Sequence, residues 1–318
     1  MTIISKDISK AVQLLNAEQI VAIPTETVYG LAGNIYSENA IKSIFKTKQR
    51  PFFNPLIVHI PSIDYLSHIV EYLPEKAKLL AQAFWPGPIT LVLKKKAIIP
   101  DLITAGKDTV AVRIPNHPST LTLLNQLEFP LAAPSANPFG SISPTTAKHV
   151  ETYFKHKIKM VLDGGACKKG IESTIIGFEN DEPIIYRLGS TAMEDIEAVV
   201  GKITILNKKK VNPDAPGMLE RHYAPKTQTI LTDSILDSIN AWKNQRIGVI
   251  TFQNKIENRH IHIQLALSEK GNLSESASNL YNILHQLDKM NLDVIIAEKF
   301  PNHGLGKSIN DRLERATK

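Results

Sequence analysis

Short runs of β-branched residues, each bounded by Gly, Pro or Asn, recur through the first two hundred residues and constrain the fold most. Bounded runs of this kind are typical of β-strands. Two of them, at 173–178 and 183–188, follow each other too closely for a helix to fit between, so the sheet is expected to be mixed and not purely parallel. The expected strands are Ile20–Ile23, Leu56–Ile60, Ile89–Leu93, Val110–Ile114, Met160–Leu162, Ser173–Phe178 and Pro183–Leu188.

Helical patterns fall between some of these strands. Ser5 is positioned to cap a helix through Leu15, and Ser37 to cap one through Thr47. Ser143 followed by proline is a start signal for a third helix, to about Phe154. The first part of the chain is therefore predicted to be an α/β unit with an open, twisted, mixed sheet.

A change of pattern divides the chain. Residues 207–227 contain three prolines, a glycine and a lysine run, which favours an extended linker. A regular strand–helix alternation follows, with strands at Thr229–Leu231, Ile247–Phe252, Ile261–Leu265 and Val294–Ala297 and helices at 233–243, 273–290 and 306–316. We therefore predict a catalytic domain over 1–204, a linker or lid over 205–228, and a small Rossmann-like domain over 229–318.

Composition narrows the class of protein. The 318 residues are 43% hydrophobic and 21% charged, which suits a globular protein with a real core. No apolar run is long enough for a membrane span, and the first residues carry no export signal. One cysteine, Cys167, forms no disulfide within the chain, and this predicts a reducing, cytoplasmic location. The formal charge of +6 suits anionic partners such as nucleotides or RNA.

Several chemistries lack their motifs. The sequence has no HExxH, CxxC or GxSxG pattern, which argues against a zinc protease, a redox dithiol and an α/β-hydrolase. Gly306-Lys307-Ser308 resembles the end of a phosphate-binding P-loop, but Pro301 stands where that loop needs glycine, so we interpret it as a helix start. Cys167 lies beside two lysines without a catalytic partner motif, which favours an incidental cysteine.

Polar clusters stand at the ends of the expected strands, where α/β folds place their sites. Pro24 to Gly30 (PTETVYG) offers hydroxyls in a bounded loop, or forms an ordinary turn. The segment from Lys46 to Arg50 closes a helix with three cations, which either complement the helix dipole or bind phosphate. Downstream, His59 lies among apolar residues and is either a ligand or a satisfied core histidine.

Further clusters contain charged or small residues in places that need an explanation. Arg113 stands within an apolar strand and needs an anion, either a protein carboxylate or a substrate carboxylate. The segment 132–144 combines small residues, which let a ligand approach the backbone, with Ser and Asn side chains. The remaining clusters are Asp163-Gly-Gly, Glu172-Ser173-Thr and Tyr186-Arg187.

In this order, the segments resemble the YrdC/Sua5 family of threonylcarbamoyl-adenylate synthases over nearly the whole chain. The signature of that family stands here as Lys48-Gln-Arg50 and Ser135-Ala-Asn137, together with PTETVYGL, FWPGPITL, DGG and EST. The end of the chain, from Ser308, and the segment Ala215 to Pro225 also resemble the two-domain members. The resemblance implies that Lys48 and Arg50 are catalytic. It implies that L-threonine is held by Thr27, His59, Arg113, the backbone of Ala133 and Ser173, and that ATP is held by Arg50, Asn54, Thr109, Ser135, Asn137, Ser143, Arg187 and Tyr223.

The implied reaction joins L-threonine, bicarbonate or CO2, and ATP into L-threonylcarbamoyl-AMP and pyrophosphate. The product serves threonylcarbamoyladenosine formation at position 37 of tRNAs that read codons beginning with A. Mg²⁺ is expected as cofactor, held mainly by the ATP phosphates. Expected partners are the transferase complex that modifies tRNA and, weakly, tRNA itself, but no membrane. Two alternatives remain at this point, which are a carbamoyl-adenylate synthase of the same fold and an RNA-binding module without enzymatic activity.

Overall fold

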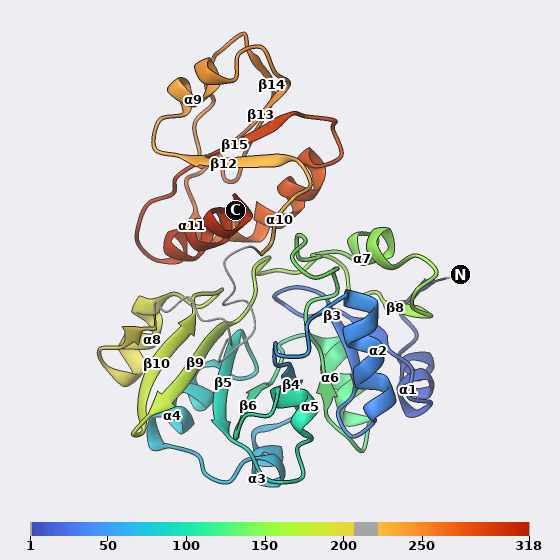
Figure 1. Cartoon of the computed structure of the whole chain (residues 1–318). Coiled ribbons are helices and arrows are strands. Elements are labelled where there is room, and N and C mark those ends of the chain that lie inside the picture. The colour runs from blue at the N-terminus through green and yellow to red at the C-terminus, as the bar shows by residue number, and fades with distance from the viewer. Residues whose placement is uncertain (1, 207–221, 318) are drawn as a thin grey trace.

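The protein folds into two α/β units with separate sheets, in a computed structural model that describes residues 2–206 and 222–317. Figure 1 shows the smaller unit, which carries the C-terminus, stacked on one end of the larger unit. Residues 207–221, which hold most of the predicted linker, lie outside the described residues. None of the described helices has the length and apolar character that crossing a membrane requires.

The larger unit has a mixed sheet of eleven strands, as its short gaps predicted. Its strands are β1 (Ile3–Ser5), β2 (Val21–Ile23), β3 (Gly30–Asn34), β4 (Ile57–His59), β5 (Ile89–Lys94), β6 (Thr109–Arg113), β7 (Leu131–Ala132), β8 (Met160–Leu162), β9 (Thr174–Glu179), β10 (Glu182–Arg187) and β11 (Thr204–Ile205). Their order is β1-β8-β2-β3-β7-β4-β6-β5-β9-β10-β11. Parallel pairing of β4 with β6 sets His59 opposite Arg113, and β9 and β10 form an antiparallel hairpin.

Three helices of the larger unit begin where a side chain accepts a backbone N–H group of the first turn, and the other described helices begin without such a cap. The helices of this unit are α1 (Ile8–Asn16), α2 (Glu38–Lys48), the 3-10 turn η1 (Ile63–Tyr65), α3 (Leu66–Ile69), α4 (Glu75–Phe84), α5 (Asp101–Thr104), α6 (Pro118–Asn125), α7 (Ala147–Phe154) and α8 (Met193–Val200). Ser37 caps α2 as predicted, with its Oγ 3.1 Å from the nitrogen of Ala40. The predicted cap at Ser5 is wrong, because Asp7 accepts the first N–H group of α1.

The predicted helix start at Ser143 is also wrong. Helix α7 begins three residues later than a cap at Ser143 requires, and Thr146 accepts the N–H of His149 as its cap. The Ser143 hydroxyl is engaged elsewhere, because it donates to Oε1 of Glu172 at 2.6 Å. A buried carboxylate therefore takes the hydroxyl that sequence analysis had assigned to a helix.

The smaller unit is a four-stranded sheet in the order β12-β15-β13-β14, all parallel, as the Rossmann-like prediction expected. Its strands are β12 (Gln228–Thr232), β13 (Ile247–Thr251), β14 (Ile261–Ala266) and β15 (Val294–Glu298), and its helices are α9 (Ile235–Ala241), α10 (Leu273–Leu287) and α11 (Leu305–Ala316). Figure 1 shows α10 and α11 between this sheet and the larger unit. These two helices therefore form the contact surface of the smaller unit.

Close packing joins the two units. Gly170 has a φ of +72°, and a Cβ there would lie 2.4 Å from the Cα of Ser278 in α10, so only glycine allows this approach. The apolar cluster around α10 and α11 also takes in Val28, Ile142 and Ile171 from the larger unit. The units thus share one continuous core at their junction.

Candidate active site

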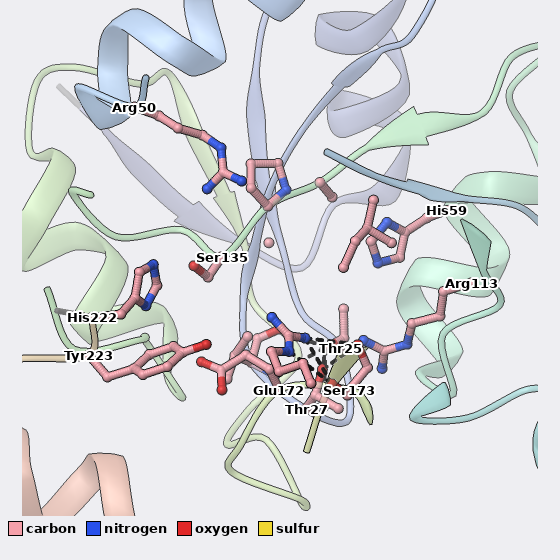
Figure 2. A pocket seen from close by; sticks show the side chains of 16 residues that line it. Thr25, Thr27, Arg50, His59, Arg113, Ser135, Glu172, Ser173, His222 and Tyr223 are labelled. Atoms are coloured by element: carbon pink, nitrogen blue, oxygen red, sulfur yellow. Dashed lines mark hydrogen bonds between the residues drawn. The ribbon is translucent and has the colours of Figure 1, made fainter. Parts of the chain in front are cut away.

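A polar pocket lies at the end of the large sheet, and its lining comes from the larger unit and from His222 and Tyr223 (Figure 2). About 550 Å³ of space there, part of it open to solvent, is free of protein atoms. Side chains with hydroxyl, imidazole, guanidinium and carboxylate groups converge there. The pocket is lined by Thr25, Thr27, Val28, Gly30, Arg50, Ile57, His59, Arg113, Ala133, Pro134, Ser135, Glu172, Ser173, Arg187, His222 and Tyr223.

Arg113 marks one end of the pocket and is held by three groups of its own unit. Its Nε donates to the carbonyl of Gly87 at 3.1 Å and its Nη1 to Oγ1 of Thr27 at 3.0 Å. Nη2 forms an ion pair with Oε1 of Glu26 at 2.6 Å, a contact outside hydrogen-bond geometry. The protein carboxylate that the sequence left open as an alternative is therefore present. The guanidinium is fixed in direction while Nη2 keeps hydrogen-bonding capacity for a ligand.

His59 lies beside Arg113 and is uncharged at neutral pH. Burial first, and then the positive charge of Arg113, lower the pKa of its imidazole to about 3. Its Nδ1 has no hydrogen-bond partner among the described residues. A neutral, partly unpaired imidazole in a pocket suits the recognition of an uncharged or polar group and does not add to the positive charge.

Arg50 and Arg187 supply positive charge away from the Arg113 end. Arg50 donates to Oδ1 of Asn54 at 2.5 Å and to the carbonyl of Pro55 at 2.7 Å, and no carboxylate pairs with it among the described residues. Burial lowers the pKa of Arg50 to about 9. Arg187 donates to the carbonyl and the hydroxyl of Ser173, at 2.8 and 3.2 Å. Two buried cations aimed at one cavity favour an anionic ligand.

Lys48 lies behind the pocket wall and not in it. Its fully buried Nζ donates to the carbonyls of Ser135 and of Asn137, the latter at 2.6 Å. The amide nitrogen of Asn137 donates to two further carbonyls of the same loop, while its Oδ1 has no partner among the described residues. In this arrangement Lys48 fixes the loop that presents Ser135.

Tyr223 and His222 form the opposite end of the pocket from Arg113 (Figure 2). Tyr223 is 1% exposed, has a φ of +63° and has no partner for its hydroxyl among the described residues. Burial raises the pKa of Tyr223, so the hydroxyl stays protonated and able to donate. The backbone N–H of His222 donates to the carbonyl of Arg315 at 3.2 Å, which ties this segment to α11.

The structure brings together nine of the fourteen predicted site residues as lining of one pocket. Four more lie outside the lining but are hydrogen-bonded to a lining residue or to each other. They are Asn54, Ser143, Asn137 and Lys48. Thr109 is separate, because it lies at the far end of β6 from Arg113 and lines another cleft with Tyr72 and Asp181. Its predicted role in ATP binding stays a prediction.

Sequence reasoning missed Glu172 and His222, which line the pocket, and Glu26, which pairs with Arg113 outside that lining. Each stood inside a motif already noted, namely EST, PTETVYG and the segment before Pro225, but no role was assigned to it. For Glu172 and Glu26, the available signal was an acidic residue directly before a predicted site residue, Ser173 or Thr27. Cys167 is buried and its pKa is raised by burial to about 12, which agrees with an incidental role.

The described residues contain no group of three His, Cys, Asp or Glu side chains that could hold a metal ion. Both carboxylate oxygens of Glu172 already accept hydrogen bonds. A Mg²⁺ ion would therefore have to take its oxygens from a ligand and from water, as this ion commonly does.

The comparisons with known proteins agree over both units. Residues 13–189 match the Sua5/YciO/YrdC family, described as "Telomere recombination", and residues 191–317 match the family described as "Threonylcarbamoyl-AMP synthase, C-terminal domain". A relative from Pyrococcus abyssi (strain GE5 / Orsay), named threonylcarbamoyl-AMP synthase, is 40% identical over 94% of this chain and 90% of its own length. One of the same name from Bacillus subtilis (strain 168) is 39% identical over 97% and 92%. The solved structure of P. abyssi Sua5 complexed with L-threonine has a TM-score of 0.92 at 38% identity and covers 100% of this chain and 97% of that one.

Proposed function

Because this chain belongs to the Sua5/YciO/YrdC family, we propose that it is a threonylcarbamoyl-AMP synthase. The observation that carries the proposal is the set of three buried guanidinium groups, Arg50, Arg113 and Arg187, around one pocket. Arg113 stands at one end of the pocket and would bind a carboxylate, while Arg50 and Arg187 would bind a polyphosphate. L-threonine and ATP together supply those two anions.

The Arg113 end suits L-threonine. A guanidinium fixed by Gly87, Thr27 and Glu26 offers a carboxylate a charge-assisted hydrogen bond, which contributes about 1.5–3 kcal/mol. The hydroxyl of Ser173 and the neutral imidazole of His59 are polar partners for the amine and side-chain hydroxyl. The structure of P. abyssi Sua5 complexed with L-threonine supports L-threonine as a ligand of this chain.

The Arg50 end suits ATP. Arg50, which has no carboxylate partner among the described residues, and Arg187 would neutralise phosphate oxygens, while Ser135 and the Tyr223 hydroxyl would donate hydrogen bonds. Lys48, predicted as catalytic, would act by holding the Ser135 loop in place. Mg²⁺, when bound to the phosphates, would add charge neutralisation.

The chemistry needs little acid–base catalysis. The threonine amine first takes up CO2 and loses a proton, giving a carbamate that is anionic at neutral pH. A carbamate oxygen then forms a bond to the α-phosphorus of ATP while the bond to the pyrophosphate oxygen breaks. The protein supplies positioning and preformed positive charge for this nucleotidyl transfer. The product is L-threonylcarbamoyl-AMP, which a tRNA-modifying transferase would consume, and a cytoplasmic location with weak tRNA binding completes the proposal.

Pyrophosphate release with and without L-threonine and bicarbonate tests this function. The purified full chain is incubated with ATP and Mg²⁺, and the adenylate is identified by mass spectrometry. Release that requires both L-threonine and bicarbonate supports the proposal. Release that ignores threonine but requires carbamoyl phosphate would indicate the carbamoyl-adenylate alternative. Salt-sensitive RNA binding by a folded protein without any release would favour the RNA-binding alternative.

A further inference from the structure

Arg312 of α11 is the largest fully buried side chain among the described residues, and it belongs to the smaller unit. Its guanidinium crosses the junction of the two units. Nε donates to Oε2 of Glu172 at 2.8 Å, and Nη2 donates to the carbonyl of Leu188 at 2.7 Å. Its Cζ also lies 4.8 Å from the centre of the Tyr223 ring, within the range of a cation–π contact. One cation thus contacts two residues that line the pocket.

Glu172 is the carboxylate of the pocket, and its acceptors are engaged from both units. Ser143 of the larger unit donates to Oε1, while Tyr281 of α10 donates to Oε2 at 2.9 Å beside Arg312. Figure 2 places Glu172 and Tyr223 on the same wall of the pocket. Burial would raise the pKa of Glu172, but Arg312 and then Arg187 outweigh it and lower the pKa. The carboxylate is therefore negative in the folded protein.

A negative carboxylate on this wall works against the proposed ligand, because ATP is itself an anion. Two like charges in a buried, low-dielectric pocket repel each other more strongly than in water. Arg312, which also pairs with Asp311 of its own helix, reduces this repulsion and does not line the cavity itself. Its place under the Tyr223 ring also limits the positions that the Tyr223 hydroxyl can take.

We propose, on the basis of the function proposed above, that Arg312 is a positioning residue of the active site. Through it, the smaller unit neutralises Glu172 and supports Tyr223, so that the pocket binds ATP more tightly when the two units are docked. The smaller unit therefore contributes to nucleotide affinity and leaves the threonine end unaffected.

Steady-state kinetics of four variants test this role against mere docking. Arg312→Met removes the charge, Glu172→Gln removes the carboxylate charge, and the double variant removes both. The control is Lys307→Met, which breaks another ion pair between the units, Lys307 to Glu194 at 2.8 Å, that does not border the pocket. We expect Arg312→Met to raise the KM for ATP by about tenfold or more, with little change in the KM for L-threonine. The double variant should recover most of that loss, and the control should resemble the unmodified protein.

Three results would overturn the proposal. They are equal rises in both KM values for Arg312→Met, a similar rise for Lys307→Met, and no recovery in the double variant. If Arg312→Met fails to fold, Arg312→Lys replaces it. This variant keeps the charge, so neutralisation of Glu172 predicts an ATP KM near that of the unmodified protein. A rise of about tenfold or more in the ATP KM of Arg312→Lys would contradict the role of the charge. A wild-type chain without threonine-dependent pyrophosphate release would overturn the proposed function instead, so the two failures are distinguishable.

Discussion

The two ends of the pocket are built in different ways. The groups that hold Arg113 in place, Gly87, Thr27 and Glu26, all come from the larger unit. At the other end, Tyr223 follows the undescribed residues 207–221 and lies against Arg312 of the smaller unit. One end is therefore formed when a single sheet folds, whereas the other is complete only when three parts of the chain meet. Substitutions should separate two kinds of defect, one in threonine binding and one in nucleotide binding.

The largest effect is expected from Arg50→Ala. Loss of this preformed cation at the nucleotide end should reduce pyrophosphate release about 100-fold or more, because Arg187 alone is then left to neutralise phosphate charge there. Lys46→Ala is the matched control, since Lys46 is an exposed cation in the last turn of α2, the helix that ends just before Arg50. Unchanged circular dichroism would show that both variants fold. Near-normal turnover of the Arg50 variant would contradict the phosphate assignment.

Arg113→Ala should produce the opposite kinetic pattern. It removes a charge-assisted hydrogen bond to the threonine carboxylate, so the KM for L-threonine should rise about 10- to 100-fold while the KM for ATP changes far less. Glu26→Gln should raise the same KM by less, because it loosens Arg113 without removing it. Equal effects on both substrates would show that the two ends are not independent.

Tyr223→Phe should have a smaller effect. The substitution removes one hydroxyl, which has no partner among the described residues, and keeps the ring over Arg312. One neutral hydrogen bond contributes about 0.5–1.5 kcal/mol, so the KM for ATP should rise about two- to tenfold. Isothermal titration with a non-hydrolysable ATP analogue measures this directly. A change confined to L-threonine binding would place Tyr223 at the wrong end.

The smallest effect is expected when the pH is lowered, which should weaken the contact between the two units. His149 of the larger unit stacks on His285 of α10, with ring centres 3.9 Å apart. Burial, and then the charges of His285 and Lys289, lower the pKa of His149 to about 3, and burial lowers that of His285 to about 4. Both pKa values in the folded protein lie below the ordinary histidine pKa of about 6.5. Between pH ~6.5 and pH ~4, these two histidines therefore take up protons in the unfolded chain and not in the folded protein. Their stabilisation is present above pH ~6.5 and is lost as the pH falls towards 4.

The melting temperatures at pH 7 and pH 5 test this prediction. The melting temperature should fall by a few degrees, and His149→Gln should show a smaller fall. His59 and His222 are also buried with lowered pKa values, so the fall should shrink without disappearing. If the KM for ATP rises at a higher pH than the KM for L-threonine as the solution is acidified, the two ends differ in acid sensitivity as well. An equal fall in melting temperature for the unmodified protein and His149→Gln would show that the histidine pair does not cause the fall.

Strands that rely on apolar side chains were predictable from the sequence, and those that rely on close backbone approach were not. The β-branched runs around β4, β6 and β13 ended within one residue or two of the observed strands. Strand β3 was missed because Gly30 stands where a Cβ would lie 3.1 Å from that of Ala133, so small residues replace the usual β-branched ones. A pattern search for β-propensity cannot find such a strand.

The site residues also fall into those that could be inferred from the sequence and those that could not. Arg113 could be inferred from the sequence because a cation within an apolar strand needs a partner wherever it folds. Arg312 could not, because its partner Glu172 lies 140 residues away and is reached only through the docking of two units. Resemblance to a family supplied residue roles, but the described contacts were needed to place Lys48 behind the wall and Ser143 on a carboxylate.

The long reach of the Arg312–Glu172 pair has a consequence for biosynthesis. A ribosome adds about 5–20 residues each second, so Glu172 is made roughly 7–30 seconds before Arg312. During that interval the larger unit can fold around an acid whose principal counterion does not yet exist. Until α11 emerges this carboxylate lacks that partner and should stay hydrated, so this wall of the pocket is completed only after the end of the chain has been made.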